Sequence, residues 1–362
     1  MPAFLTALAL LALAASAEAQ NATPAGKWTV ELYGGRSSGS DSTSGKPTAT
    51  FPAGDPFTLD SGQPSRAVPS WFFGDGAVLL NQVLTQFAAN TGATFPRIAA
   101  VDAALGASGG RLGSGGVFGV RIGRVLTPKL TAELTMERSL AKMVIRDSLL
   151  NGLEAGGDSF TAAFQTLLSS LPVTNLSVTS TLATRDDRNA QTRLAGALKW
   201  TVSSGKRIEA YVTGGGGLIR NSGDGAQAIL TGRYTFRLFG TFPVDQTDHV
   251  VVSVNQPESR AMGLVGGGVT LALSSNAGLR ADVRLLLSAM RDVTTLSASP
   301  DTDAQSPPIV LSTSPGISPG IQFSTQAEVR STLRGAIDNL SVFTGSGLSK
   351  QVAFTLGVFK RF

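Results

Sequence analysis

Strict alternation of apolar and polar side chains is the feature of this sequence that most restricts its fold. Near the start of the chain, Trp28, Val30 and Leu32 alternate with Thr29 and Glu31. Successive side chains of a β-strand point to opposite faces of the sheet, whereas those of a helix repeat roughly every 3.6 residues. The alternation therefore predicts a strand with one apolar face and one polar, charged face.

The same pattern occurs in eight stretches, each close to the roughly ten residues that a tilted strand needs to cross a bilayer. The stretches are residues 27–35, 116–125, 130–142, 191–202, 206–219, 261–273, 279–288 and 351–362. Three of the connections between them are tight turns, which alternate with four long segments, residues 36–115, 143–190, 220–260 and 289–350. Short turns alternating with long loops, in an even number of strands, are typical of an antiparallel barrel that spans a membrane.

The fold class predicted is all-β: a transmembrane, antiparallel, up-and-down β-barrel with long extracellular loops that carry short helices. Eight strands are expected. Residues 229–239 and 249–254 are also strand-like. They fit either one long hairpin that extends the flanking strands, with Gly240 near Asp248 at its tip, or a separate membrane hairpin, which would give ten strands. A soluble β-sandwich or lipid-binding barrel would alternate too, but would bury its apolar face.

The polar faces of the predicted strands carry acids and bases in nearly equal numbers. The interior of an eight-stranded barrel is just filled by side chains, so charges placed there must pair with one another. A mid-membrane Arg on the lipid side would instead cost about 2–4 kcal/mol. We therefore expect an ionic network in the lumen, formed by Glu31, Arg121, Glu133, Glu137, Lys199, Glu209, Arg280, Asp282 and Arg284. In a soluble sandwich the same face would be solvated.

The first residues of the chain predict secretion. Leu5 to Ala15 form a short apolar run, and Ala17 and Ala19 fit the small-x-small pattern of a signal-peptide cleavage site. The expected division is a signal peptide at residues 1–19 and one barrel domain at residues 20–362. The chain has no Cys and one His, which removes the usual zinc, iron–sulfur and thiol chemistries, so no cofactor is expected. The net charge of +5 is spread along the chain, so nucleic acid is not an expected partner.

The chain ends in QVAFTLGVFKRF, in which Phe354, Leu356 and Val358 alternate and Phe362 is terminal. This resembles the C-terminal strand of bacterial outer-membrane barrels, which their assembly machinery recognises. One position departs from the pattern, because Lys360 stands where that family usually has an apolar or aromatic residue. The resemblance implies a bacterial outer-membrane location, with the barrel assembly machinery and outer-membrane lipids as partners. The strand layout is similar to that of the OmpA transmembrane domain, OmpX and OmpW families, although the loops here are longer.

Two loops contain apolar residues at the spacing of short amphipathic helices, at residues 77–90 and 160–171. They would form a plug, a lid or an adhesive surface, or simply pack together to cap the barrel. The Ser- and Pro-rich stretch at residues 300–319 is expected to be mobile.

Three functions fit these features. The first is a structural or interaction barrel that displays large loops at the cell surface. The second is a small, porin-like outer-membrane pore. The third is an outer-membrane lipid-modifying enzyme, for which His249 with Asp245 or Asp248 and a Ser is the only candidate catalytic set. The filled lumen favours the first, no catalytic residue is assigned, and no pattern identifies an extracellular ligand.

Overall fold

The computed structural model describes residues 25–48, 50–59, 61–107, 109–185, 190–205, 207–222, 225–302, 309–310, 320–323 and 331–362. The predicted signal peptide at residues 1–19 lies outside these residues, as does most of the Pro-rich stretch. No helix in the described part of the chain combines the length and apolarity needed to cross a membrane.

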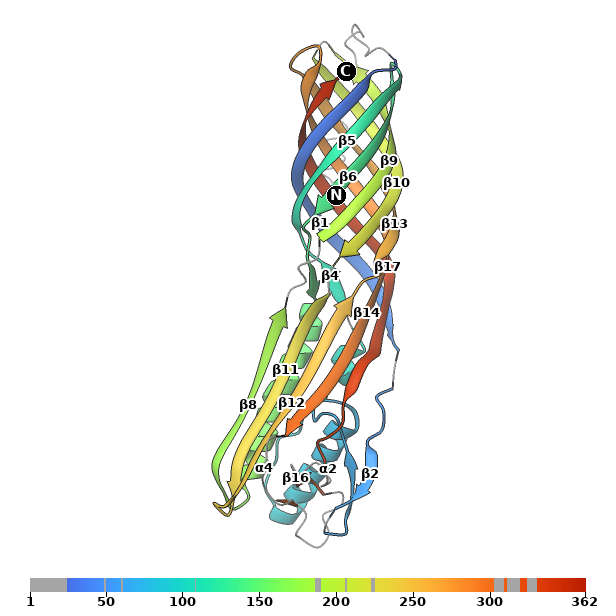
Figure 1. Cartoon of the computed structure of the whole chain (residues 1–362). Helices are drawn as coiled ribbons and strands as arrows, with labels where there is room; N and C mark the ends of the chain where they lie inside the picture. Colours follow the sequence, from blue (N-terminus) through green and yellow to red (C-terminus); the bar gives the residue numbers. More distant parts are fainter. Residues whose placement is uncertain are drawn as a thin grey trace.

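In the described residues, eight strands pair into a closed antiparallel ring at one end of the molecule (Figure 1). In ring order they are β1 (Trp28–Pro47), β5 (Gly115–Thr127), β6 (Leu130–Ser139), β9 (Ala190–Ser204), β10 (Ile208–Ser222), β13 (Ser259–Ala272), β14 (Ala277–Thr302) and β17 (Ile337–Arg361). The pairing of β17 with β1 and of β13 with β14 closes the ring. The prediction of an all-β antiparallel barrel is confirmed.

The sheet as a whole contains eleven strands in the described residues, more than the eight or ten expected. The three additional strands are β8 (Val173–Arg185), β11 (Ala226–Leu238) and β12 (Phe242–Asn255). They join the sheet beyond the ring, in the order β17-β14-β12-β11-β8. The count was too low because residues 229–239 and 249–254 were expected to extend the flanking strands rather than to count separately, and residues 173–185 were taken for loop.

The additional strands prolong strands of the ring. The pairing of β10 with β13 ends at Arg220↔Ser259, and the pairing of β11 with β12 starts at Ala226↔Val254 in nearly the same register. β5 and β6 stop where these strands continue, so the ring opens into a curved sheet (Figure 1). Of the two alternatives for residues 229–239 and 249–254, the long hairpin that extends the flanking strands is therefore the correct one. Its tip was placed wrongly, because β12 already begins at Phe242 and Asp248 pairs with Gly232 in the middle of the hairpin.

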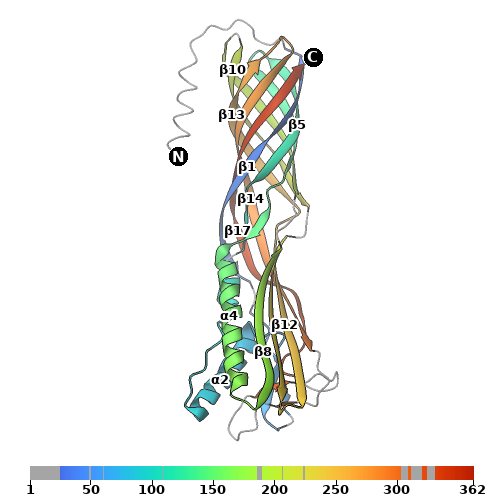
Figure 2. The same cartoon turned by 90° about the vertical axis from the view of Figure 1, so that its left-hand side faces the viewer.

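Two helices pack beside the open sheet, α2 (Gly74–Thr91) and α4 (Asp147–Ser169), with a short turn of helix, α3 (Asp102–Leu105) (Figure 2). α2 ends at Gly92, whose φ of 69° is the left-handed conformation that favours glycine, and the Gly92 N–H bonds to Ala88 O. α4 starts well before the predicted residue 160. In the described residues, three small two-stranded sheets complete the fold: β2 (Asp55–Thr58) with β3 (Pro64–Ala67), β4 (Gly110–Leu112) with β7 (Met143–Ile145), and β15 (Ile309–Val310) with β16 (Gln322–Phe323).

We call the projecting unit the cap: β8, β11, β12, the outer parts of β14 and β17, and the helices α2 and α4. Its core is apolar and rich in aromatic rings. The Phe164 ring stacks on Tyr234 with centroids 4.6 Å apart, and Phe160 lies 4.9 Å from Phe72. Gly232 lies beneath these rings, where a Cβ would approach Phe160 and Phe72 to below 3.0 Å. The cap is thus a packed domain with a core of its own.

Candidate functional site: the lumen of the ring

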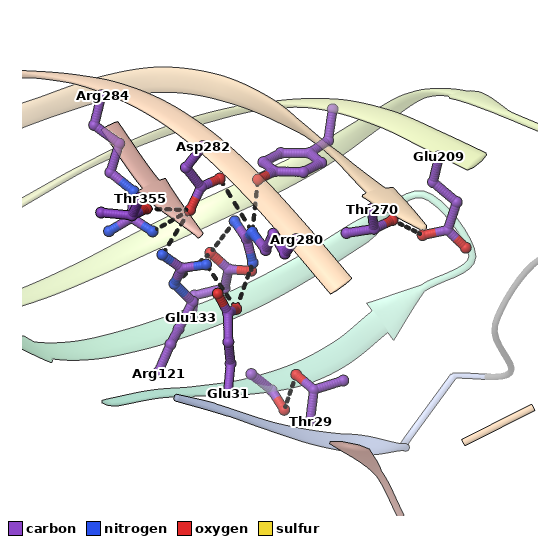
Figure 3. A network of polar contacts seen from close by, with 12 residues as sticks. Thr29, Glu31, Arg121, Glu133, Glu209, Thr270, Arg280, Asp282, Arg284 and Thr355 are labelled. Atoms are coloured by element: carbon purple, nitrogen blue, oxygen red, sulfur yellow. Dashed lines mark hydrogen bonds and ion pairs between the residues drawn. The ribbon is translucent and has the colours of Figure 1, made fainter. Parts of the chain in front are cut away.

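The predicted lumen residues come from strands around the whole ring. Glu31 lies on β1, Arg121 on β5, Glu133 on β6, and Arg280 and Asp282 on β14. All five are buried, with exposed fractions of 7% or less. The alternation places each on the inner face, and the narrow ring brings their ends together near its centre (Figure 3).

Arg280 is the most connected side chain of this cluster. Its Nη1 and Nη2 atoms donate to Glu133 Oε1 and Oε2 at 2.6 and 3.2 Å, a two-pronged ion pair. Its Nε donates to Asp282 Oδ1 at 3.1 Å and to the Tyr211 hydroxyl at 2.6 Å. The guanidinium also lies 4.4 Å from the centre of the Tyr211 ring. One arginine therefore links side chains from β6, β10 and β14 across the lumen.

Arg121 completes the cluster from the opposite wall. It donates to Glu31 Oε2 at 2.7 Å and to Asp282 Oδ2 at 2.8 Å, and its Nε lies 3.8 Å from Glu133 Oε2. Arg284 donates to the same Asp282 oxygen at 2.6 Å. Three guanidinium groups thus face three carboxylates, so the charges balance within the cluster, which is the condition for placing ionised groups in a narrow interior.

A second cluster lies nearer the cap. Arg193 Nη1 donates to Glu137 Oε1 at 2.6 Å, and the Tyr33 hydroxyl donates to Glu137 Oε2 at 3.0 Å. Arg193 Nη2 donates to Gln191 at 3.1 Å and also bonds to Gln351. Glu137 is therefore held by one charged and one neutral donor from different strands.

The third cluster lies at the tight-turn end. Arg361 Nη2 is 3.4 Å from Glu209 Oε2, and Thr270 donates to the same oxygen at 3.2 Å. Lys199 Nζ lies 5.2 Å from the centre of the Tyr211 ring. A small cavity of about 40 Å³ adjoins these residues, enough for about one water molecule.

Glycines on the inner face make room for the charged groups. A Cβ at Gly357 would overlap the Glu31 carboxylate, and a Cβ at Gly268 would overlap the Tyr211 hydroxyl and Asp282. These positions pair directly with network strands, as Gly357↔Arg280 and Gly268↔Asp282. The high glycine content, 42 of 362 residues, therefore serves in part to fit long side chains into a narrow lumen.

The outer face of the ring is apolar. Leu32, Leu356 and Met136 are 65%, 71% and 61% exposed, and Trp28 and Trp200 lie exposed near the tight-turn end. The charged side chains that the described residues of the ring place on this face are all basic: Arg36, Arg124, Arg138, Arg220, Lys350 and Lys360. Arg36 pairs with Gly116 on β5, eight residues from Arg124 on the same strand. At the usual strand rise and tilt, Arg36 and Arg124 therefore mark two levels of the outer face about 20 Å apart along the ring axis.

The C-terminal strand residues that sequence alternation singled out lie on this outer face. Phe354, Leu356, Val358 and Phe362 are all 59% or more exposed. The last residue is also tied into the ring, because the Phe362 N–H donates to Trp28 O at 2.9 Å and the Trp28 N–H donates to Phe362 O at 3.3 Å. The end of the chain therefore closes the seam between β17 and β1.

Sequence reasoning missed several members of the lumen clusters. Tyr33 and Tyr211 lie on the polar face but were not assigned to the network, and Gln351 and Arg361 were overlooked because only one face of the last strand was considered. The alternation itself was the signal that could have found them. Arg207, on the polar face of the predicted stretch, lies instead in the turn before β10 and is exposed.

The candidate catalytic set is not assembled. His249 Nδ1 lies 3.0 Å from Thr231 Oγ1, whereas Asp245 pairs with Arg233 at 2.6 Å. Asp248 is fully buried on the opposite face of the strand from its neighbour His249, where Ser70 donates to it at 2.9 Å.

No family model and no curated protein sequence matches the chain. Among solved structures it is similar to the outer membrane protease OmpT from Escherichia coli, at 8% identity over 94% of this chain and 100% of that one, with a TM-score of 0.27. It is also similar to the COG4313 outer membrane channel from Pseudomonas putida F1 (10% identity, 95% and 100% coverage, TM-score 0.21) and to a FadL homologue from Pseudomonas aeruginosa (9%, 92% and 90%, 0.18).

The first two of these proteins are outer membrane proteins by name. None of the three is an OmpA, OmpX or OmpW protein, the families whose layout the strand pattern resembles. With TM-scores of 0.27 or less, these are general likenesses only.

Proposed function

We propose that this chain is an integral β-barrel of the bacterial outer membrane, a structural or interaction barrel that holds the cap at the cell surface. The observation that carries the proposal is the distribution of side chains around the ring. Glu31 is 4% exposed and points inward, whereas its neighbour Leu32 is 65% exposed and points outward. A soluble barrel would have the opposite arrangement, because burial of apolar surface drives its folding.

The orientation follows from the connections. The three tight turns and the C-terminal residue lie at one end of the ring, and the cap lies at the other (Figure 1). Outer-membrane barrels have short periplasmic turns and long extracellular loops. The cap is therefore assigned to the cell surface, and the eight strands of the ring to the membrane.

The lumen clusters favour an interaction barrel over a pore. Arg280 and Arg121 cross the lumen in contact with carboxylates from the facing strands. The cavity beside them, about 40 Å³, is too small for a solute path. Beyond the ring, the apolar core of the cap stands above the lumen. Catalysis is not part of the proposal, because His249, Asp245 and Asp248 do not converge.

The test is made on the mature protein. Membrane fractionation should place it in the outer membrane, and the unboiled protein should migrate differently from the boiled protein on gels. In planar bilayers it should show no large ohmic conductance. A soluble periplasmic protein would refute the membrane barrel. A folded membrane protein with steady, large conductance would instead support the pore.

A further inference from the structure

The outer face of the ring carries a groove with a volume of about 670 Å³ across β10, β13, β14, β17 and β1. Ligand sites in proteins typically measure about 300–1,000 Å³. Exposed side chains such as Leu32, Leu356 and Val358 form its walls, and Gly34 and Ala281 lie between them. The groove is thus apolar, large enough for a ligand, and on the face that the proposed function assigns to lipid.

The strand register explains why the groove forms there. Gly34, Leu356 and Ala281 are direct partners on β1, β17 and β14, so two small residues flank one large one in that row. The adjoining row toward the tight turns holds Leu32, Val358, Leu279, Leu271 and Ile208, which are all large and exposed. The row with the two small residues is therefore lower than the adjoining row of large apolar side chains, and this difference in height forms the groove.

Two cations stand at the tight-turn end of the groove. Lys360 follows Val358 on the same face of β17, about 7 Å further along the strand. Its ammonium lies 5.2 Å from the centre of the Phe362 ring. Arg207 is exposed in the turn next to Ile208. In the ring, the described acidic side chains point inward, so no Asp or Glu carboxylate on the outer face of the ring neutralises these cations.

We propose that the groove binds an acyl chain of an anionic phospholipid of the periplasmic leaflet, with the lipid phosphate against Lys360. Apolar walls at membrane depth fit a hydrocarbon chain. A cation at the interface, with its stem along the apolar surface, complements the headgroup. The site rests on the proposed membrane location. It also accounts for the charged residue at the one position where the terminal strand departs from the usual pattern.

The test uses the mature chain refolded from urea into maltoside micelles, which bypasses cellular assembly. Palmitoyl-oleoyl phosphatidylglycerol or phosphatidylcholine is added, and retained lipid is counted by native mass spectrometry. The wild type should retain one phosphatidylglycerol preferentially. Ala281→Phe fills the groove and should reduce retention at least fivefold. Lys360→Gln should abolish the preference for phosphatidylglycerol over phosphatidylcholine.

Matched controls lie on the far side of the ring. Ala132→Phe adds the same ring to an outward alanine of β6, and Lys129→Gln removes an exposed cation from the turn between β5 and β6. Both should behave as the wild type. Equal lipid retention by the folded Ala281→Phe and Ala132→Phe proteins would refute the lipid site in the groove but leave the proposed membrane barrel standing. A wild type that does not insert into vesicles or shift on heating would overturn the membrane barrel and the groove together.

Discussion

Arg280 and Glu133 form a two-pronged ion pair inside the ring although 147 positions separate them in the sequence. They sit on strands that are not neighbours, β14 and β6. The pair therefore spans the lumen and does not merely bridge adjacent strands, and both the stability of the ring and the closure of the lumen should depend on it.

Glu133→Ala should destabilise the ring, because it leaves Arg280 and Arg121 without one of their carboxylates in a buried site. Removing one partner of a buried pair costs about 3–5 kcal/mol. The urea unfolding midpoint in micelles measures this loss, and planar-bilayer conductance reports whether the lumen opens. Glu258→Ala is the control, since Glu258 pairs with Arg220 in a bridge whose side chains are both 73% exposed, worth at most about 1 kcal/mol. Equal midpoints for the two variants would contradict the prediction.

Gly357→Val should also disturb the network, but by crowding it. The new side chain would overlap the Glu31 carboxylate, and inserting atoms into a packed interior typically costs about 1–3 kcal/mol. Gly196→Val is the matched control, because nothing lies within 4 Å of a Cβ at Gly196. Heat-modifiability as a function of temperature compares the two. Equal heat resistance of the Gly357→Val and Gly196→Val proteins would contradict the prediction, because it would mean that the lumen can accommodate the extra atoms.

Deletion of Phe362 should impair assembly in cells more than it impairs the stability of the folded barrel. The lost contact of the Phe362 ring with lipid is worth at most roughly 2–3 kcal/mol, which a closed ring can survive, whereas loss of the terminal strand signal acts before insertion. The amount of protein in the outer membrane, compared with the midpoint of protein refolded in vitro, separates the effects. Phe239→Ala, at an exposed cap tip, is the control. Wild-type amounts of the truncated protein in the outer membrane would refute the prediction.

The cap should lose stability as the pH rises from about 4 to 7. Burial raises the pKa of Asp248 to about 7 from its ordinary 3.8, while hydrogen bonds from the Trp71 N–H and Ser70 partly oppose the rise. Between these values the folded cap holds a proton that the unfolded cap releases, so stability falls by up to about 1.4 kcal/mol per pH unit. Above pH 7 no further loss is expected from this group.

Trp71 fluorescence in a Trp28→Phe, Trp200→Phe background would follow cap melting across that range. Asp248→Asn, which is uncharged at every pH, should remove the Asp248 part of the slope and leave only the part due to Asp102, whose pKa is also raised by burial. Asp245→Asn, which breaks the exposed bridge to Arg233, should keep it. A cap whose melting temperature does not change between pH 4 and 7 would contradict the assignment.

Phe164→Ala should unfold the cap and spare the ring. Phe164 is fully buried and stacks on Tyr234, and truncating a buried Phe typically costs about 3–5 kcal/mol. Limited proteolysis of protein in vesicles should then cleave within the cap and leave the ring strands protected. Simultaneous loss of both parts would show that they fold as a single cooperative unit.

Sequence alternation placed β5, β6, β9, β10 and β13 to within three residues, because inward and outward side chains alternate along a barrel strand. It missed the outer parts of β1, β14 and β17, which continue 12 to 14 residues beyond the predicted stretches. Glu31 and Arg121 could thus be assigned to one face from parity alone. Which carboxylate meets which guanidinium depends on shear and side-chain length across the lumen, so the pairing of Arg280 with Glu133 could not be read from the sequence.

The cap was harder to predict for a different reason. Residues 173–185 alternate between apolar side chains and Thr or Ser, without the charged face that marked the ring strands, and were taken for loop. The two helices carried a clear apolar spacing, but α4 begins at Asp147 because Leu149 and Leu153 pack in the cap core. Such contacts between distant segments are invisible to local periodicity.

β14 and β17 run side by side from Ala277↔Lys360 at the tight-turn end of the ring to Ala298↔Ile337 inside the cap. A mechanical load on the cap would therefore act along these strands, and the hydrogen bonds between them would have to break at the same time. At a hinge, the same bonds would break one after another. Through this pairing, tension on the cap would pass directly into the ring.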